Sequence, residues 1–62
     1  MSSSEVIKKF KADGWYQVGQ VGSHLHFKHS IKPGRVTVEH PLKDIPKGTL
    51  TSIRRQAGLD LR

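Results

Sequence analysis

The stretch H-L-H-F-K-H begins at His24, and its first five residues alternate strictly between polar and apolar side chains. This period of two predicts a β-strand with Leu25 and Phe27 on one face and with His24, His26 and Lys28 on the other. A sheet that contains such a strand has one apolar face to bury and one polar, basic face to leave open. The pattern therefore predicts a sheet that is covered on one side only, and the rest of the chain must supply the cover.

Two further strands are predicted beside this one. Residues 15–21, W-Y-Q-V-G-Q-V, are rich in aromatic and β-branched side chains, and the glycine inside this run marks a bulge or a close approach of another backbone segment. Gly22 and Ser23 then form a natural turn into the next strand. Residues 32–35, K-P-G-R, are typical of a turn, and V-T-V at 36–38 follows as a third strand. Short connections of this kind indicate an antiparallel meander.

One amphipathic helix is predicted before the strands and one after them. The first has a capping-box pattern, with a serine three residues ahead of Glu5, and Gly14 is placed to end it. The second begins with Pro46, which suits a first helical turn, and Gly58 is placed to end it. Each helix has a single apolar stripe at helical spacing. The stripes consist of Val6, Ile7 and Phe10 in the first helix and of Leu50, Ile53 and Ala57 in the second.

The expected element order is therefore α-β-β-β-α over a single domain, residues 1–62. The simplest way to bury all the apolar faces is an α+β fold of two layers, in which a three-stranded antiparallel sheet carries both helices on one face. The opposite face, with His24, His26 and Lys28, then stays open. The residues expected in the core are Phe10, Leu25, Phe27, Val36, Val38, Leu50 and Ile53.

The charge balance limits the choice of partner. Eleven Lys and Arg residues stand against five Asp and Glu residues, a formal net charge of +6, which favours nucleic acid or an acidic protein. The chain has no cysteine, so disulfides are excluded, and no apolar run approaches the roughly 18 residues that a membrane span needs. Because the N-terminal residues are too polar for a signal peptide, we expect a cytoplasmic protein without membrane contact.

The histidines of the opening stretch admit three interpretations. A metal site would need ligands beyond His24 and His26, so we expect neither a metal nor another cofactor. His29, at the end of the strand, is expected to be an ordinary surface residue. An imidazole also transfers protons near neutral pH, and RNA supplies its own nucleophile, the 2′-hydroxyl. One positioned histidine with a nearby cation is therefore sufficient to cleave RNA without metal, although the residues alone do not select this reaction.

Four blocks of the chain, in this order, resemble the HicA family of toxins. They are K-K-F-K-A-D-G-W at 8–15, G-S-H at 22–24, V-T-V-E-H-P at 36–41 and K-G-T-L-T-S-I-R-R-Q-A-G-L at 47–59. The resemblance implies a fold similar to the double-stranded-RNA-binding domain. It also implies the activity of a bacterial type II toxin, a metal-independent endoribonuclease that cleaves mRNA. The implied inhibitory partner is a HicB-type antitoxin, and DNA would be contacted only indirectly, through that antitoxin.

Carried over residue by residue, the resemblance assigns proton transfer to His24 of the G-S-H motif. Ser23 is then expected to contact a phosphate or to orient the turn, and Gly22 to serve the turn itself. Two positions depart from the family pattern. Gly19 stands where many members have a basic residue ahead of the motif, which removes a charge near the expected site. Glu39 stands where many members have proline, and its carboxylate would repel phosphate or orient the histidine that follows.

Basic residues outside the motif are expected to bind RNA phosphate. Lys28 lies on the same predicted strand face as His24, while Lys47, Arg54 and Arg55 lie along the exposed side of the second predicted helix. If these residues bind RNA, the affinity should fall as the salt concentration rises, because counterions are released on binding.

Three questions stay open from the sequence. The second group, which protonates the leaving oxygen, is His26, His40 or none, with Glu39 as a weaker candidate. The same fold also suits a non-catalytic module that binds double-stranded RNA by its shape and needs no catalytic histidine. Trp15 and Tyr16 either stack on bases or pack in the core. We expect the antitoxin to cover the open basic face by charge complementarity.

Overall fold

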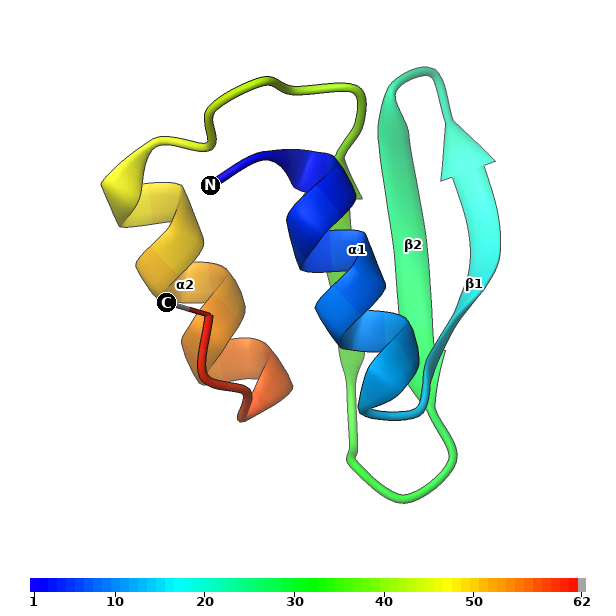
Figure 1. The fold of residues 1–62 in the computed structure, drawn as a ribbon. Helices are drawn as coiled ribbons and strands as arrows, with labels where there is room; N and C mark the ends of the chain where they lie inside the picture. The colour runs from blue at the N-terminus through cyan, green and yellow to red at the C-terminus, as the bar shows by residue number, and fades with distance from the viewer. Residues whose placement is uncertain (62) are drawn as a thin grey trace.

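The computed structural model describes residues 1–61 and shows two helices packed on one face of a three-stranded sheet (Figure 1). The expected order α-β-β-β-α is confirmed. Helix α1 crosses the sheet, and α2 lies on the β3 side of it. The elements are α1 (Ser3–Ala12), β1 (Trp15–Val21), β2 (His24–His29), β3 (Arg35–Glu39) and α2 (Lys47–Ala57).

The sheet is antiparallel, with β2 in the centre and β1 and β3 at its edges. The register between β1 and β2 shifts between Gln17 and Gly19, so of the two alternatives expected at the glycine of this strand the structure shows the bulge. Gly34, at a φ of +87°, lies in the connection from β2 to β3, and only glycine adopts this conformation without strain. The strand that carries the G-S-H histidine is therefore held by hydrogen-bonded neighbours on both of its edges.

One face of the sheet is buried under the helices, and the alternation in β2 decides which side chains enter it. Leu25 and Phe27 point into the core, and the Phe27 ring meets the Phe10 ring of α1 edge-on, with centroids 5.4 Å apart. The two predicted strand faces are thus confirmed. The buried apolar residues are Val6, Phe10, Trp15, Leu25, Phe27, Val36, Val38, Ile45, Ile53, Ala57 and Leu61.

The core differs from the expected one at a few positions. Leu50 is only partly buried against the core. Ile45 and Leu61, which lie outside the helices and strands, belong to the buried core instead. The adjacent aromatic residues at the start of β1 divide between the two alternatives. Trp15 is 2% exposed and belongs to the core, while Tyr16 is 49% exposed on the opposite side of the strand. Of these two aromatic residues, only Tyr16 is therefore available to stack on a ligand.

The helix ends follow the sequence signals, with one difference. Ser2 and Glu5 form the expected capping box of α1, and the hydrogen bond from the Ser2 backbone N–H lowers the pKa of the Glu5 carboxyl from its ordinary value. Gly14 follows α1 with a φ of +98°, and Gly58 ends α2 in the left-handed conformation. The expectation for Pro46 is wrong by one residue, since it is the N-cap of α2 and precedes the first turn.

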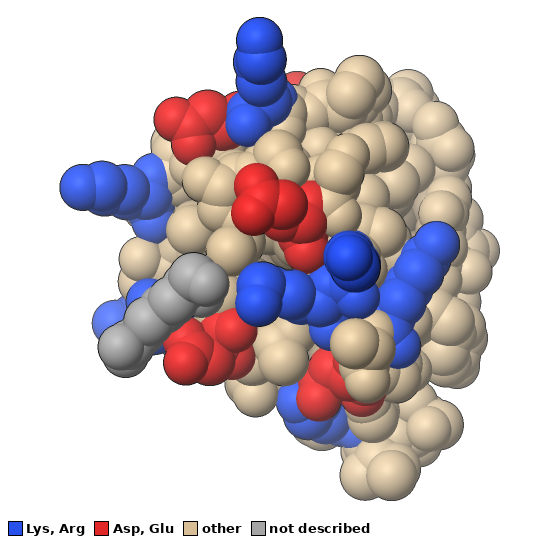
Figure 2. Space-filling model, in the orientation of Figure 1, with Lys and Arg blue, Asp and Glu red and all other residues tan. Residues whose placement is uncertain are grey.

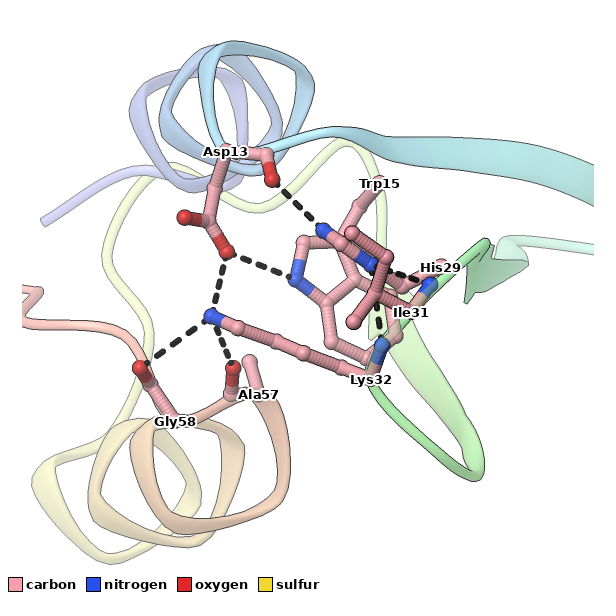
Figure 3. Close-up of polar contacts among 7 residues, drawn as sticks. All are labelled: Asp13, Trp15, His29, Ile31, Lys32, Ala57 and Gly58. Carbon is pink, nitrogen blue, oxygen red and sulfur yellow. Dashed lines mark hydrogen bonds and ion pairs between the residues drawn. The ribbon is translucent and has the colours of Figure 1, made fainter.

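A lysine between β2 and β3 joins both helices to the sheet (Figure 3). The Lys32 ammonium donates hydrogen bonds to Oδ2 of Asp13 at 2.5 Å and to the carbonyl oxygens of Ala57 and Gly58 at 3.1 and 3.3 Å. It thereby satisfies carbonyl groups at the C-terminal end of α2. Its hydrogen bond to Asp13 is the main reason that the pKa of the Asp13 carboxyl lies below its ordinary value.

His29 is not the ordinary surface residue that the sequence suggests. Its Nδ1 accepts hydrogen bonds from the backbone N–H groups of Ile31 and Lys32, both at 3.0 Å (Figure 3). Nε2 must then carry the proton, which it donates to the Asp13 carbonyl oxygen at 2.7 Å. The ring is half-buried and stands edge-on to Trp15. His29 is therefore a structural residue that orders the connection from β2 to β3.

Candidate functional site

The G-S-H motif forms the turn from β1 to β2 and places its histidine at the start of the central strand. Gly22 has a φ of +59°, so the turn uses a conformation that favours glycine. The turn is held from both sides, because Gln20 Nε2 donates to the Gly22 carbonyl at 2.8 Å and the Ser23 carbonyl accepts the His40 backbone N–H at 2.7 Å. Ser23 in this turn and His24 directly after it are both exposed.

The uncovered face of the sheet, which we call the open face, presents the polar side chains of β2 with their cross-strand partners. Across β2 and β3 the pairs are His24 with Glu39, His26 with Thr37, and Lys28 with Arg35. Residues directly opposite each other in neighbouring strands share one face of the sheet. The open face therefore brings His24, His26 and Lys28 together, as the alternation in the sequence predicts.

The two histidines of the open face have different surroundings. None of residues 1–61 donates or accepts a hydrogen bond at the His24 ring, and the side chain is exposed. His26 is half-buried, and its Nδ1 shares a hydrogen bond with Thr37 Oγ1 at 3.0 Å. The strand rise of about 3.3 Å per residue places the two Cα atoms about 6.6 Å apart along β2. One ring is thus free to meet a ligand, and its neighbour is oriented by a hydroxyl.

His40 lies on the other side of the sheet from His24. Its Nδ1 is 2.7 Å from the Oγ of Ser3 in α1, and this buried hydroxyl also accepts the Leu42 backbone N–H at 2.8 Å. The Ser3 hydroxyl proton is then best placed to be donated to His40. His40 therefore connects the end of β3 to α1, and the structure does not bring it to His24.

The basic residues of α2 also lie away from the open face, because α2 packs on the covered side of the sheet. Lys47 and Arg55 are exposed there, as expected, whereas Arg54 is half-buried, and its Nε is a buried donor without a partner among the described residues. Arg54 and Arg55 help to line a shallow hollow of about 450 Å³ at the C-terminal end of α2. The structure therefore separates these three residues from His24 and Lys28.

The two sides of the molecule differ in charge as well. On the helix-covered side, Lys and Arg residues lie among Asp and Glu residues, and β1 at its margin carries no charged residue (Figure 2). Within the three strands, by contrast, Glu39 is the only acidic residue, against the basic Lys28 and Arg35. The open face therefore combines imidazole and cationic side chains with a single carboxylate.

Two further structural features bear on the class of protein. Within residues 1–61, no three His, Cys, Asp or Glu side chains cluster in a way that would hold a metal ion. None of the helices in this part of the chain has the length and apolar character that crossing a membrane requires.

The sheet adds two residues to the open face that no sequence motif connects with it. The sequence marks Arg35 as part of a turn and Tyr16 as one of two adjacent aromatic residues, yet both lie opposite Lys28, one on each side of it. The signal for them is the strand register, because each stands one residue before or after a buried core residue of its own strand.

A comparison with protein families gives a match to the family described as the HicA toxin of bacterial toxin–antitoxin systems, over residues 3–59. No curated protein matches the chain significantly. The family match spans both helices, all three strands and the G-S-H turn. Because it covers most of the 62 residues, the chain belongs to the HicA toxin family of bacterial toxin–antitoxin systems.

Proposed function

We propose that this toxin is a metal-independent endoribonuclease that cleaves mRNA, with His24 as the proton-transferring residue. The observation that carries the proposal is the position of His24. It is exposed at the start of β2, its ring has no hydrogen-bond partner among the described residues, and it shares the open face with basic side chains. Such a group meets a substrate without first giving up a structural role.

The chemistry uses the nucleophile that RNA carries. His24 accepts the proton of a 2′-hydroxyl while that oxygen forms a bond to the adjacent phosphorus. The bond from phosphorus to the 5′-oxygen breaks, which leaves a 2′,3′-cyclic phosphate and, once the leaving oxygen has taken up a proton, a 5′-hydroxyl. DNA has no 2′-hydroxyl and is not cleaved by this route. A positioned base of this kind contributes a factor of roughly 10²–10⁴ to the rate.

His26 is our candidate for protonating the leaving oxygen. It lies on the same face as His24, and its hydrogen bond to Thr37 occupies Nδ1, so that Nε2 is left for the substrate. His40 is a poorer candidate because Ser3 holds it on the covered side. We assign the phosphate contact near the cleaved bond to Ser23, which directly precedes His24, and we expect Lys28, further along β2, to bind phosphate of the same RNA.

Lys47, Arg54 and Arg55 contribute to RNA binding only where the RNA passes around the edge of the sheet to α2. Their position on the covered side also favours a second candidate function, a non-catalytic module that binds double-stranded RNA by its shape through helix faces. The two functions differ in their dependence on His24, which the duplex-binding module would not need.

We further propose that a HicB-type antitoxin inhibits the toxin by covering the open face. A partner with an acidic surface would complement the net charge of +6 and block access to His24. The toxin would act in the cytoplasm, where mRNA is found, as a single domain over residues 1–62, and would reach DNA only through the antitoxin. No metal or cofactor takes part in the proposed step.

The proposal is tested by inducible expression of the toxin in bacteria without an antitoxin. We expect wild-type protein to arrest growth and to shorten the half-lives of several mRNAs, and His24→Ala to do neither. Lys8→Ala, an exposed change on α1, is the control and should remain toxic. If His24→Ala accumulates as folded protein and still degrades mRNA at the wild-type rate, the assignment is wrong.

A further inference from the structure

We propose that Tyr16, Lys28 and Arg35 form a binding subsite for single-stranded RNA, separate from the cleavage position at His24. The proposal rests on the proposed function, since it names how the substrate of that site is held. The three residues come from three different strands, and no single stretch of the sequence reveals them as a group.

The register of the sheet places the three side chains in one row across the open face. Tyr16 of β1 lies opposite Lys28 of β2, and Lys28 lies opposite Arg35 of β3. Each of them neighbours a buried residue in its own strand, so each points away from the helices. All three side chains are exposed, and Tyr16 is 49% exposed. The row therefore offers an aromatic ring beside two cations on an uncovered surface.

The charges around the row favour a phosphate chain as its ligand. The only acidic residue in the strands is Glu39, which lies opposite His24 at the other end of β2. Asp13 is engaged by Lys32 and Trp15 at the covered side of the sheet, so it does not neutralise the row. Lys28 and Arg35 thus keep their full attraction for phosphate, and Tyr16 adds a stacking surface for a base.

The position of the row shows which part of the RNA it would hold. Lys28 is four residues from His24 along β2, about 13 Å at the usual strand rise, so one phosphate cannot contact both residues. Between the two rows, β1 contains Gly19, opposite His26, and the bulge residue Val18, which is 43% exposed. The subsite therefore binds nucleotides that are not cleaved.

An exposed tyrosine on the open face also distinguishes single strands from duplexes. Stacking on Tyr16 requires a base whose face is free, whereas the bases of a double helix are stacked on one another. Recognition of A-form shape would instead require a surface that follows the minor groove. The structure therefore points to unpaired RNA as the ligand of this face.

Binding is measured by fluorescence anisotropy with the His24→Ala protein and a labelled, unstructured ten-nucleotide RNA, so that the probe is not cleaved. We expect Tyr16→Ala to weaken binding about 5-fold to about 100-fold, the effect of losing one stacked base. Tyr16→Phe keeps the ring and should bind like the parent. The pair Lys28→Ala/Arg35→Ala should reduce the salt dependence of binding by about 1.4 in the slope of log K against log salt, because two phosphate contacts are lost.

Matched controls separate the subsite from a general loss of charge. Lys8→Ala/Lys9→Ala removes two exposed cations from α1 and should change affinity less than the pair on the open face. Equal losses from both pairs would overturn the proposal, as would unchanged binding by a folded Tyr16→Ala protein, or a duplex of the same sequence that binds as tightly as the single strand. Failure of the parent protein to bind RNA at all would overturn it too.

Kinetics of the nucleolytic protein keep this proposal apart from the proposed function. A subsite that holds uncleaved nucleotides equally in the ground state and the transition state raises KM when it is lost and leaves kcat unchanged. We expect this pattern for Tyr16→Ala in the wild-type background. A fall in kcat at constant KM would contradict the subsite while leaving the nuclease in place, whereas absence of cleavage by the wild-type protein would count against the nuclease alone.

Discussion

Glu39 of β3 lies directly opposite His24 of β2 on the uncovered face of the sheet. Next to this pair, the His40 backbone N–H donates a hydrogen bond to the Ser23 carbonyl oxygen, which connects the two strands at this end. No hydrogen bond joins the two side chains among the described residues. The one carboxylate of the strands thus stands beside the histidine that we propose to be catalytic, where an approaching phosphate would meet both.

Replacing Glu39 by Gln should strengthen RNA binding. A carboxylate a few ångströms from a phosphate repels it by about 1 kcal/mol in water, which corresponds to about 5-fold in affinity. We expect this gain at low salt and a smaller one at high salt, because the charges are exposed and screened. The measurement is the affinity of His24→Ala and of His24→Ala/Glu39→Gln for a short RNA at several salt concentrations. Weaker binding after the change would show that Glu39 supports the RNA.

Introducing Arg at Gly19 should restore a positive charge beside the site. Gly19 lies opposite His26 on the open face, a Cβ there would meet no atom within 4 Å, and its φ is not positive. The side chain therefore fits without strain, and one added phosphate contact should steepen the salt dependence of binding by about 0.7 in log–log slope. Gly19→Gln is the uncharged control. An unchanged slope for Gly19→Arg would place the RNA away from this part of the sheet.

Removal of the Lys32 ammonium should destabilise the fold, because this group joins α1, the connection after β2 and the end of α2. Lys32→Met keeps the apolar stem and loses the hydrogen bonds to Asp13, Ala57 and Gly58. The loss at the helix terminus alone is about 0.3–1 kcal/mol, enough to lower the Tm of so small a domain by a few degrees. Urea denaturation compares this variant with Lys43→Met, an exposed lysine of the loop before α2. Equal midpoints for the two variants would rule out the bridging role.

The Asp13–Lys32 contact also predicts how stability depends on pH. The folded-state pKa of Asp13 is lowered, chiefly by the hydrogen bond from Lys32, so between the two pKa values the unfolded chain holds more protons. The stabilisation is present above the unfolded pKa of about 3.9 and is lost as the pH falls through the lower folded value. Asp13→Asn should therefore flatten the acid side of the stability curve, and Lys32→Met should do the same. If the free energy of unfolding falls in the same way at acid pH for the wild type and for Asp13→Asn, the lowered pKa of Asp13 is not the cause of the pH dependence.

Local patterns predict most of the fold because they act over a few residues. The alternation around Leu25 and Phe27, the capping box of Ser2 and Glu5, and the left-handed Gly58 each follow from a signal of at most five positions. These signals suffice to order the elements and to assign the two faces of the sheet. They also place His24 on the open face, where the structure has it.

Contacts between distant residues could not be predicted in the same way. Lys32 is 19 residues from Asp13 and 26 from Gly58, and none of the three belongs to a periodic pattern. His29 looks like a surface residue at the end of a strand. It becomes structural only because the turn at Gly14 brings the Asp13 carbonyl over its ring, so closely that a Cβ on Gly14 would lie 2.9 Å from Nε2.

The most direct test of the account is the cleavage of an unstructured RNA by purified protein in excess EDTA, under single-turnover conditions. We predict that wild-type protein cleaves the RNA without metal and leaves 2′,3′-cyclic phosphate ends. His24→Ala, folded by circular dichroism, should be slower by at least about 10²-fold, since the positioned base is lost. Cleavage by His24→Ala at the wild-type rate, or a wild-type protein that binds RNA and leaves it intact, would contradict the assignment of His24 as the catalytic residue.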